Sequence, residues 1–252
     1  PPRGGACAHP APGAGAIVRY APPAAGAPRL EVAGWLLRGE IDPLGEPLVS
    51  ARELAEMAAA YAPSLEVAVA SDADRFGALR WRRGVARPEI DATEPAVYVG
   101  RSYAHYEDRG LLQIVYTVLF PDDRITWRVT LAPDGEPLVY EAVGADGCRA
   151  VALTPRARLR DTAAAAAAYR LARVDEDARP LLALAAGSHR IGVPRLVRGS
   201  DSLVRYTLRP FDELRSAPTL EGRNRGAAGR PAFGGEAPLE ASFAFDLPEA
   251  RP

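Results

Sequence analysis

The sequence contains no lysine, and all 31 of its basic residues are arginines. Without a lysine amine, Schiff-base chemistry and a phosphate-binding Gly-x-x-x-x-Gly-Lys loop are both excluded. Asparagine and glutamine occur once each, at Asn224 and Gln113. This bias is typical of a GC-rich bacterial genome. The arginine content therefore does not indicate nucleic-acid binding, because arginine here also stands in for surface lysine.

The chain also lacks an excess of either charge and lacks long apolar runs. Its 31 basic and 32 acidic residues leave a net charge of −1, so no overall field attracts it to nucleic acid or anionic lipid. The longest apolar stretches, at residues 111–120 and 180–186, are strand-sized and shorter than the roughly 18 residues of a membrane span. We expect no nucleic-acid partner and no transmembrane segment.

Only two cysteines are present, Cys7 and Cys148. The chain starts at Pro1 without a basic and then apolar leader, which suggests that a leader was removed or never included and favours a periplasmic or extracellular location. In such a compartment, Cys7 and Cys148 could form a disulfide that attaches the N-terminal segment to the body of the protein. Two unrelated thiols and a lipid anchor at Cys7 are the alternatives.

Histidine is scarce as well, with His9, His105 and His189 as the whole set. No Gly-x-Ser-x-Gly, His-Glu-x-x-His or Cys-x-x-Cys motif accompanies them, so we expect neither a metal nor a cofactor. Strand alternation places His105 and Glu107 on one face and Asp108 on the other, and a histidine two residues from a carboxylate can share a proton or a metal. His189 follows an apolar strand in a turn, which suits either a functional group or a structural hydrogen bond.

What the chain has in quantity is the composition of a globular protein. Of its 252 residues, 48% are hydrophobic and 25% are charged, which predicts one domain from residue 30 to residue 252. Residues 1–29 are rich in proline, glycine and alanine and predict an extended N-terminal arm or linker. The tract 221–238 predicts a long loop.

Two segments predict helices. Ser50 followed by Glu53 forms a capping-box pattern ahead of an apolar face that reaches Tyr61, and Pro63 then ends the helix. The second predicted helix spans residues 161–173 and contains six consecutive alanines, the residue of highest helix propensity.

Strands account for most of the rest. Segments rich in Val, Tyr, Ile and Thr, separated by short turns, predict an antiparallel meander over residues 96–106, 111–120, 125–131 and 137–143. Other strands are predicted at 30–37, 65–70, 180–186, 191–197, 203–208 and 241–247. The expected fold is α+β and mostly antiparallel β: a β-sandwich-like single domain with one or two helices.

The strand block resembles a family of uncharacterised bacterial exported proteins. The resemblance is carried by Pro95-Ala-Val-Tyr98, Leu112-Gln-Ile-Val-Tyr116, Ile125-Thr-Trp-Arg-Val-Thr-Leu131 and Leu138-Val-Tyr140, with extensions through 180–189 and 206–214, about half of the chain. That family carries a dense Cys and His cluster after the Leu-Val-Tyr strand. Here the corresponding stretch holds Cys148 alone, so the resemblance implies the fold and export but no such metal or redox site.

More distantly, the helix ending in Tyr61-Ala-Pro63, the next strand and a later Trp-containing strand are similar in layout to β-sandwich proteins of the necrosis-inducing and vacuolar-sorting-62-like kind. Those proteins keep a metal site beside an Asp-Trp-Glu strand. This chain has Thr126-Trp127-Arg128 there, so the similarity implies the architecture without the metal.

Three hypotheses of function follow. The first is a non-enzymatic exported subunit that binds a protein partner or assembly, favoured by the scarcity of catalytic residue types and by the proline-rich arm. The second is a metal-dependent or acid/base hydrolase that uses His105, Glu107 or Asp108, and His189. The third is a small-ligand binder whose cavity between two β layers is lined by Trp81, Tyr116 and Trp127, although these side chains are most simply core residues.

Overall fold

The predicted meander forms the centre of the larger of two sheets. In the computed structural model, which describes residues 15–81, 88–106, 109–144, 149–159, 170–173, 179–192, 195–197, 204–215 and 245–246, four long strands pair antiparallel in chain order. They are β5 (Ala96–Tyr106), β6 (Arg109–Leu119), β7 (Arg124–Leu131) and β8 (Pro137–Gly144). These strands are rich in β-branched and aromatic residues, which pack well on a pleated surface.

Three further strands complete this sheet, giving the order β11-β9-β8-β7-β6-β5-β15. β9 (Arg149–Leu153) continues the antiparallel pairing next to β8. At the two edges, β11 (Arg170–Arg173) pairs with β9 and β15 (Thr207–Pro210) pairs with β5, both in parallel. The parallel strands come from distant parts of the sequence, since a parallel pair needs a long crossover connection.

The smaller sheet is mixed and has the order β13-β12-β2-β1-β14. Its strands are β1 (Ala16–Ala21), β2 (Ser64–Val69), β12 (Arg179–Leu184), β13 (Arg195–Val197) and β14 (Val204–Arg205). Two small strand pairs lie outside both sheets: β3 (Ala78–Arg80) with β4 (Glu89–Asp91), and β10 (Arg158–Leu159) with β16 (Phe245–Asp246).

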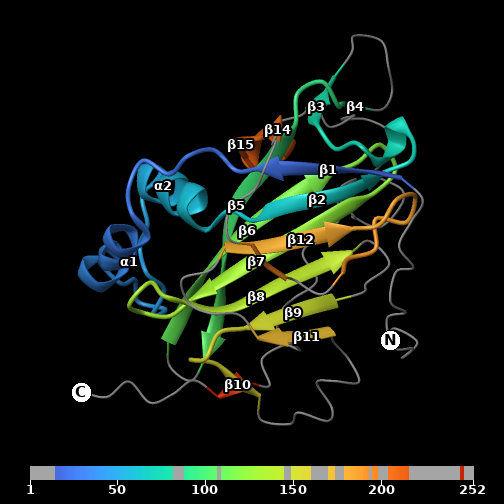
Figure 1. Ribbon diagram of the computed structural model, residues 1–252. Helices are drawn as coiled ribbons and strands as arrows, with labels where there is room; N and C mark the ends of the chain where they lie inside the picture. Colours follow the sequence, from blue (N-terminus) through green and yellow to red (C-terminus); the bar gives the residue numbers. More distant parts are fainter. Residues whose placement is uncertain are drawn as a thin grey trace, which may run out of the picture.

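Helices α1 (Arg29–Arg38) and α2 (Ala51–Tyr61) lie together at one end of the sheets, on the left in Figure 1. The capping box of α2 is confirmed: Glu53 N–H donates to Ser50 Oγ at 3.2 Å, and Ser50 N–H donates to Glu53 Oε2 at 2.9 Å. The helix ends at Tyr61, two residues before Pro63, as expected. The remaining helices are one-turn pieces, the 3-10 helix η1 (Asp72–Asp74) and α4 (Asp212–Arg215).

The main core fills the space between the two sheets. Alternate residues of β7, among them Trp127 and Val129, point inward and meet Leu65 and Val67 of β2 and Leu182 of β12 in one buried apolar cluster. Trp127 stacks on the neighbouring strand's Tyr140, with ring centroids 5.7 Å apart. Burial of large aromatic and aliphatic side chains on both inner faces is the main favourable term in holding such sheets together.

Buried tyrosine hydroxyls fasten α2 and the segment after it to the rest of the protein. Tyr116 of β6 donates a hydrogen bond of 2.8 Å to the carbonyl oxygen of Ala58, one of the helix-end carbonyls that lack a partner within the helix. Tyr61 donates to the Gly135 carbonyl at 2.8 Å, and Tyr206 donates to the Pro63 carbonyl at 2.7 Å. Burial raises the pKa of the Tyr61 phenol, so the hydroxyl stays protonated and able to donate.

Three predictions made from the sequence are wrong. Residues 16–21, assigned to the arm, form β1 inside the smaller sheet. Residues 30–37, predicted as a strand, belong to α1, because Val32, Ala33 and Leu36 have helical spacing and are buried together. Residues 170–173, predicted as the end of a helix, form β11 because they pair with β9. Residues 161–169, the tract 221–238, Cys7 and Cys148 lie outside the described residues.

The predicted class is confirmed: the protein is α+β and consists mostly of antiparallel strands in two sheets with few helices. Within the described residues, no helix has the length and apolar character needed to cross a membrane.

Replacing Tyr116 by phenylalanine should lower the free energy of unfolding by about 1–2 kcal/mol, because the Ala58 carbonyl loses its donor while the ring still fills its place. Tyr116→Ala should cost about 3–5 kcal/mol, because it also removes the core packing of the ring. Urea denaturation followed by circular dichroism measures both. Unchanged stability of Tyr116→Phe would show that the hydrogen bond to Ala58 does not stabilise the fold, and equal losses for the two variants would show that the ring contributes nothing beyond it.

Candidate functional site

His189 lies in a buried cluster with two aspartates. It follows β12 in a turn with an unusual φ of +45°, and its ring is stacked on Phe120 with centroids 3.8 Å apart. Nε2 lies 3.4 Å from Asp74 Oδ1, and Nδ1 lies 3.3 Å from Asp123 Oδ2. His189 is 4% exposed and Asp74 is 1% exposed.

Asp74 is held by the backbone around it. Its Oδ2 accepts hydrogen bonds from the N–H groups of Ala70 at 3.0 Å and Ser71 at 2.8 Å, and from Ser71 Oγ at 3.1 Å. Its Oδ1 accepts from the N–H of Gly187, two residues before the histidine. Burial alone would raise the pKa of Asp74, but these hydrogen bonds outweigh it and hold the pKa below its ordinary value.

The cluster joins three segments that are distant in sequence. Asp74 belongs to η1 after β2, Asp123 belongs to the turn between β6 and β7, and His189 follows β12. Both ring nitrogens face carboxylates and the ring face is covered by Phe120, so the imidazole has no open side for a substrate. The geometry suits a structural latch between the sheets better than an acid/base catalyst.

His105 lies at the other end of the molecule. It is paired with Gly110 at the start of β6, whereas Phe120, on which His189 stacks, follows the end of that strand. Ten residues of extended strand separate these positions by roughly 33 Å. The structure therefore does not bring His105 and His189 into one pocket. Glu107 and Asp108 lie outside the described residues.

The three predicted ligand-binding aromatics lie in different surroundings. Tyr116 and Trp127 are fully buried and directly opposite each other on β6 and β7, where they fill the core. Trp81, just after β3, is 36% exposed. None of the three lines the groove described next.

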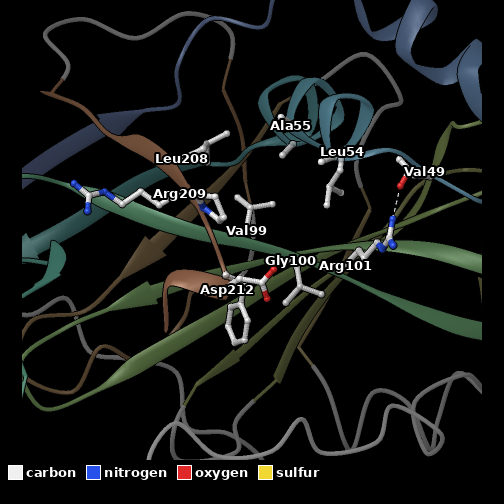
Figure 2. A pocket seen from close by; sticks show the side chains of 14 residues that line it. Val49, Leu54, Ala55, Val99, Gly100, Arg101, Leu208, Arg209 and Asp212 are labelled. Atoms are coloured by element: carbon white, nitrogen blue, oxygen red, sulfur yellow. Dashed lines mark hydrogen bonds between the residues drawn. The ribbon is translucent and has the colours of Figure 1, made fainter. Parts of the chain in front are cut away.

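An apolar groove of about 640 Å³ lies where β15 leaves the edge of β5 (Figure 2). One wall is formed by Val49 and by the face of α2 that carries Leu54 and Ala55. The opposite wall is formed by residues 208–212, and Gly100 lies at the floor. A volume of this size is within the range of about 300–1,000 Å³ that is typical of ligand sites.

Gly100 keeps the floor of the groove open. A Cβ at this position would lie 3.2 Å from Cβ of Phe211, closer than most such contacts. Polar side chains also line the groove: Arg101 donates to the carbonyl oxygen of Val49, and Asp212 lies on the side formed by residues 208–212 (Figure 2). The Arg209 guanidinium points away from the groove toward Glu94, 2.9 Å from it.

A buried ion cluster occupies the other face of the larger sheet. Glu141 of β8 lies 3.5 Å from the guanidinium of Arg128 and 3.5 Å from that of Arg149. Burial raises the pKa of Glu141, while the two guanidinium groups oppose that rise. Its three charged groups pair with one another, so we assign this cluster to the structure.

Exposed large apolar side chains are concentrated in one short segment of the chain. Of the seven among the described residues, four lie between residues 37 and 48: Leu37, Ile41, Leu44 and Leu48, exposed by 52% to 71%. We call these four the apolar corner. They occupy the end of α1 and the hairpin that leads to α2. Single exposed apolar residues are ordinary, and it is the occurrence of four of them in one short segment that sets this part of the surface apart.

Sequence reasoning missed the groove, the corner and Asp74. The groove depends on pairing between β5 and β15, over 100 residues apart, which no local pattern reveals. Ile41 and Leu44 sit in a turn-forming stretch where their exposure has no sequence signal. Among the described residues, no group of three His, Cys, Asp or Glu side chains could hold a metal ion.

No family model matches the chain, and neither a curated protein nor a solved structure matches it. The resemblances drawn from the sequence therefore stay predictions.

Replacing Asp74 by asparagine should flatten the dependence of stability on pH in the acid range. Because the folded pKa of Asp74 is below its unfolded value of about 3.9, its contribution is fully present above that value and is lost as the pH falls through the folded pKa. At neutral pH the variant should be less stable by on the order of 2 kcal/mol, since several hydrogen bonds to a charged acceptor are weakened.

Asp72→Asn is the matched control, because its side chain is fully exposed two residues earlier in the same turn. Urea denaturation of the two variants and the wild type between about pH 2 and pH 7 covers the range. Identical pH profiles for both variants would contradict the assignment of Asp74.

Proposed function

We propose that this protein is a non-enzymatic, exported binding subunit that docks onto a protein partner through the apolar corner. The observation that carries the proposal is that Leu37, Ile41, Leu44 and Leu48 lie within one short segment and are all more than half exposed. Export itself is a prediction from the sequence.

The hairpin of the corner is built rigidly, which supports a role for its apolar residues. Asp42 Oδ1 accepts hydrogen bonds from the N–H groups of Leu44 at 2.8 Å and Glu46 at 2.9 Å, and Gly45 takes a positive φ of 81°. These contacts make a tight turn with Leu44 at its tip. A leucine that is held in a fixed position and left in water contributes little to the stability of this fold.

The hairpin is also anchored to the larger sheet. Gly110 N–H donates to the Gly45 carbonyl at 3.0 Å, and Tyr103 Oη donates to the Pro47 carbonyl at 3.1 Å. Arg101 donates to the carbonyl of Val49. A surface fixed before binding loses less conformational entropy when a partner arrives, which favours affinity.

The charges around the corner favour a protein over an anionic membrane. Glu40, Asp42 and Glu46 lie in the same hairpin, with Arg38 before it and Arg101 bound to Val49 after it as basic residues. This acidic surround would repel anionic lipid headgroups. It complements an apolar protein surface rimmed by basic groups.

The two other hypotheses have weaker support. A hydrolase that joins His105 to His189 lacks a shared pocket, since the two lie at opposite ends of β6. A small-ligand binder lined by Trp81, Tyr116 and Trp127 has less support, since Tyr116 and Trp127 are buried in the core while Trp81 is partly exposed. The groove beside Gly100 remains a place where a ligand could bind.

A photoreactive benzoylphenylalanine at position 44 should crosslink to a defined protein in an extract of the source cells. The same group at Thr93, in the exposed turn before β5, is the positional control. Unlabelled wild-type protein should compete with the labelled protein and reduce the adduct. The Leu44→Ser variant should need an at least about tenfold higher concentration for the same reduction, because burial of a leucine is worth roughly 1.5–3 kcal/mol.

Equal competition by Leu44→Ser and wild type would contradict docking at the corner. Adducts only with a second copy of the chain, or binding of the wild type to phosphatidylglycerol vesicles that Leu44→Ser loses, would contradict the choice of partner.

A further inference from the structure

The groove beside Gly100 coincides with an edge of the larger sheet. β15 pairs with β5 only as far as Val99, where Phe211 N–H donates to the Val99 carbonyl at 2.8 Å. Beyond this point, no described strand pairs with the outer side of β5. The edge of β5 is therefore covered by a described strand only up to Val99. The next residue, Gly100, forms the floor of the groove.

The hydrogen-bonding direction of β5 follows from its contacts with β15. The carbonyls of Pro95 and Val99 accept from the β15 side, at 2.9 and 2.8 Å. Because backbone groups alternate along a strand, Arg101 and Tyr103 direct their N–H and C=O groups to the same side. Arg101 itself lines the groove. Its backbone can thus pair with an extended chain lying there.

The walls provide a place for a side chain of such a segment. Leu54 and Ala55 on α2 face Leu208 on β15 across the groove (Figure 2). In strand addition, main-chain hydrogen bonds provide affinity and a pocket for alternate side chains provides specificity. A groove of about 640 Å³ has room for a large apolar side chain.

The groove is also continuous with the apolar corner. Leu48 of the corner is followed directly by Val49, which lines the groove, and the hairpin that carries the corner is anchored on β5 beside it. A partner that covers Leu44 and Leu48 would need only a short extension to reach Gly100.

We propose that the groove binds an extended segment of the partner, which adds to the edge of β5 at Arg101 and inserts a large apolar side chain between α2 and β15. The inference rests on the proposed function, since it names how the partner's chain engages this side of the molecule. The ligand class is a peptide in β conformation with an apolar residue at its centre.

The probe is the blocked peptide acetyl-Thr-Val-Phe-Val-Thr-amide, titrated into the purified full chain and followed by the methyl resonances of Val99 and Leu208. The expected result is saturable binding. Two control peptides have the same sequence. One is N-methylated at the second and fourth residues, and the other at the first, third and fifth. Only one of them should lose binding, by at least about tenfold, because just one alternate set of N–H groups faces a neighbouring strand.

Ala55→Leu fills the groove and should weaken binding of the parent peptide by at least about tenfold. Both residues favour helix, so α2 is preserved. Arg52→Leu places the same side chain on an exposed position of α2 that does not line the groove, and should bind as the wild type does. Leu44→Ser should also bind this short peptide normally.

Absence of saturable binding overturns the proposal. So does equal tolerance of both N-methylated peptides, which would show an apolar site without strand pairing, or stronger binding of octanoate than of the peptide, which would assign the groove to amphiphiles. Failure of crosslinking at position 44 together with normal peptide binding would instead contradict the proposed role of the corner.

Discussion

The attachment of α2 to the larger sheet determines where the proposed interaction surfaces of this protein lie. A helix end leaves carbonyl groups without partners, and here a buried tyrosine from β6 meets one of them, while Tyr61 at the end of the helix binds the β7–β8 turn. Because each hydroxyl donates to one acceptor, these hydrogen bonds fix where the helix lies on the sheet as well as its distance from the sheet. The groove takes one wall from α2, and the hairpin of the apolar corner leads into its N-terminus.

The parts of the fold that the sequence predicted are those governed by local rules. The capping box of Ser50 and Glu53 and the turns of the β5–β8 meander involve neighbours in the chain, and these predictions are confirmed. The strand prediction for residues 30–37 is wrong because their apolar positions satisfy both a helical and a strand pattern. Tertiary packing against α2 decides between the two. The sequence does not predict β1, because a short strand inside a proline-rich and alanine-rich stretch has too few residues to show alternation.

The candidate site was predicted only in part, for the same reason. His189 was recognised as a residue of interest, but its partners Asp74 and Asp123 come from separate turns that only the folded chain brings together. Its role also changes once they are known: a histidine enclosed by two carboxylates and a phenylalanine ring is a fastener between sheets. The pairing of β5 with β15 joins segments over 100 residues apart, and no periodicity in either segment indicates it.

The point at which β15 leaves the sheet determines how much of the β5 edge is left uncovered. β15 leaves the sheet at Pro210, and the chain then turns into α4. Phe211 N–H still donates to the Val99 carbonyl, and the turn into α4 then carries the chain away from the edge. The length of uncovered edge is therefore the difference between two strand lengths. In evolutionary terms this is an easily adjusted quantity: an insertion of two residues before Pro210 would let the chain cover its own edge, and a deletion would lengthen the opening without altering the core.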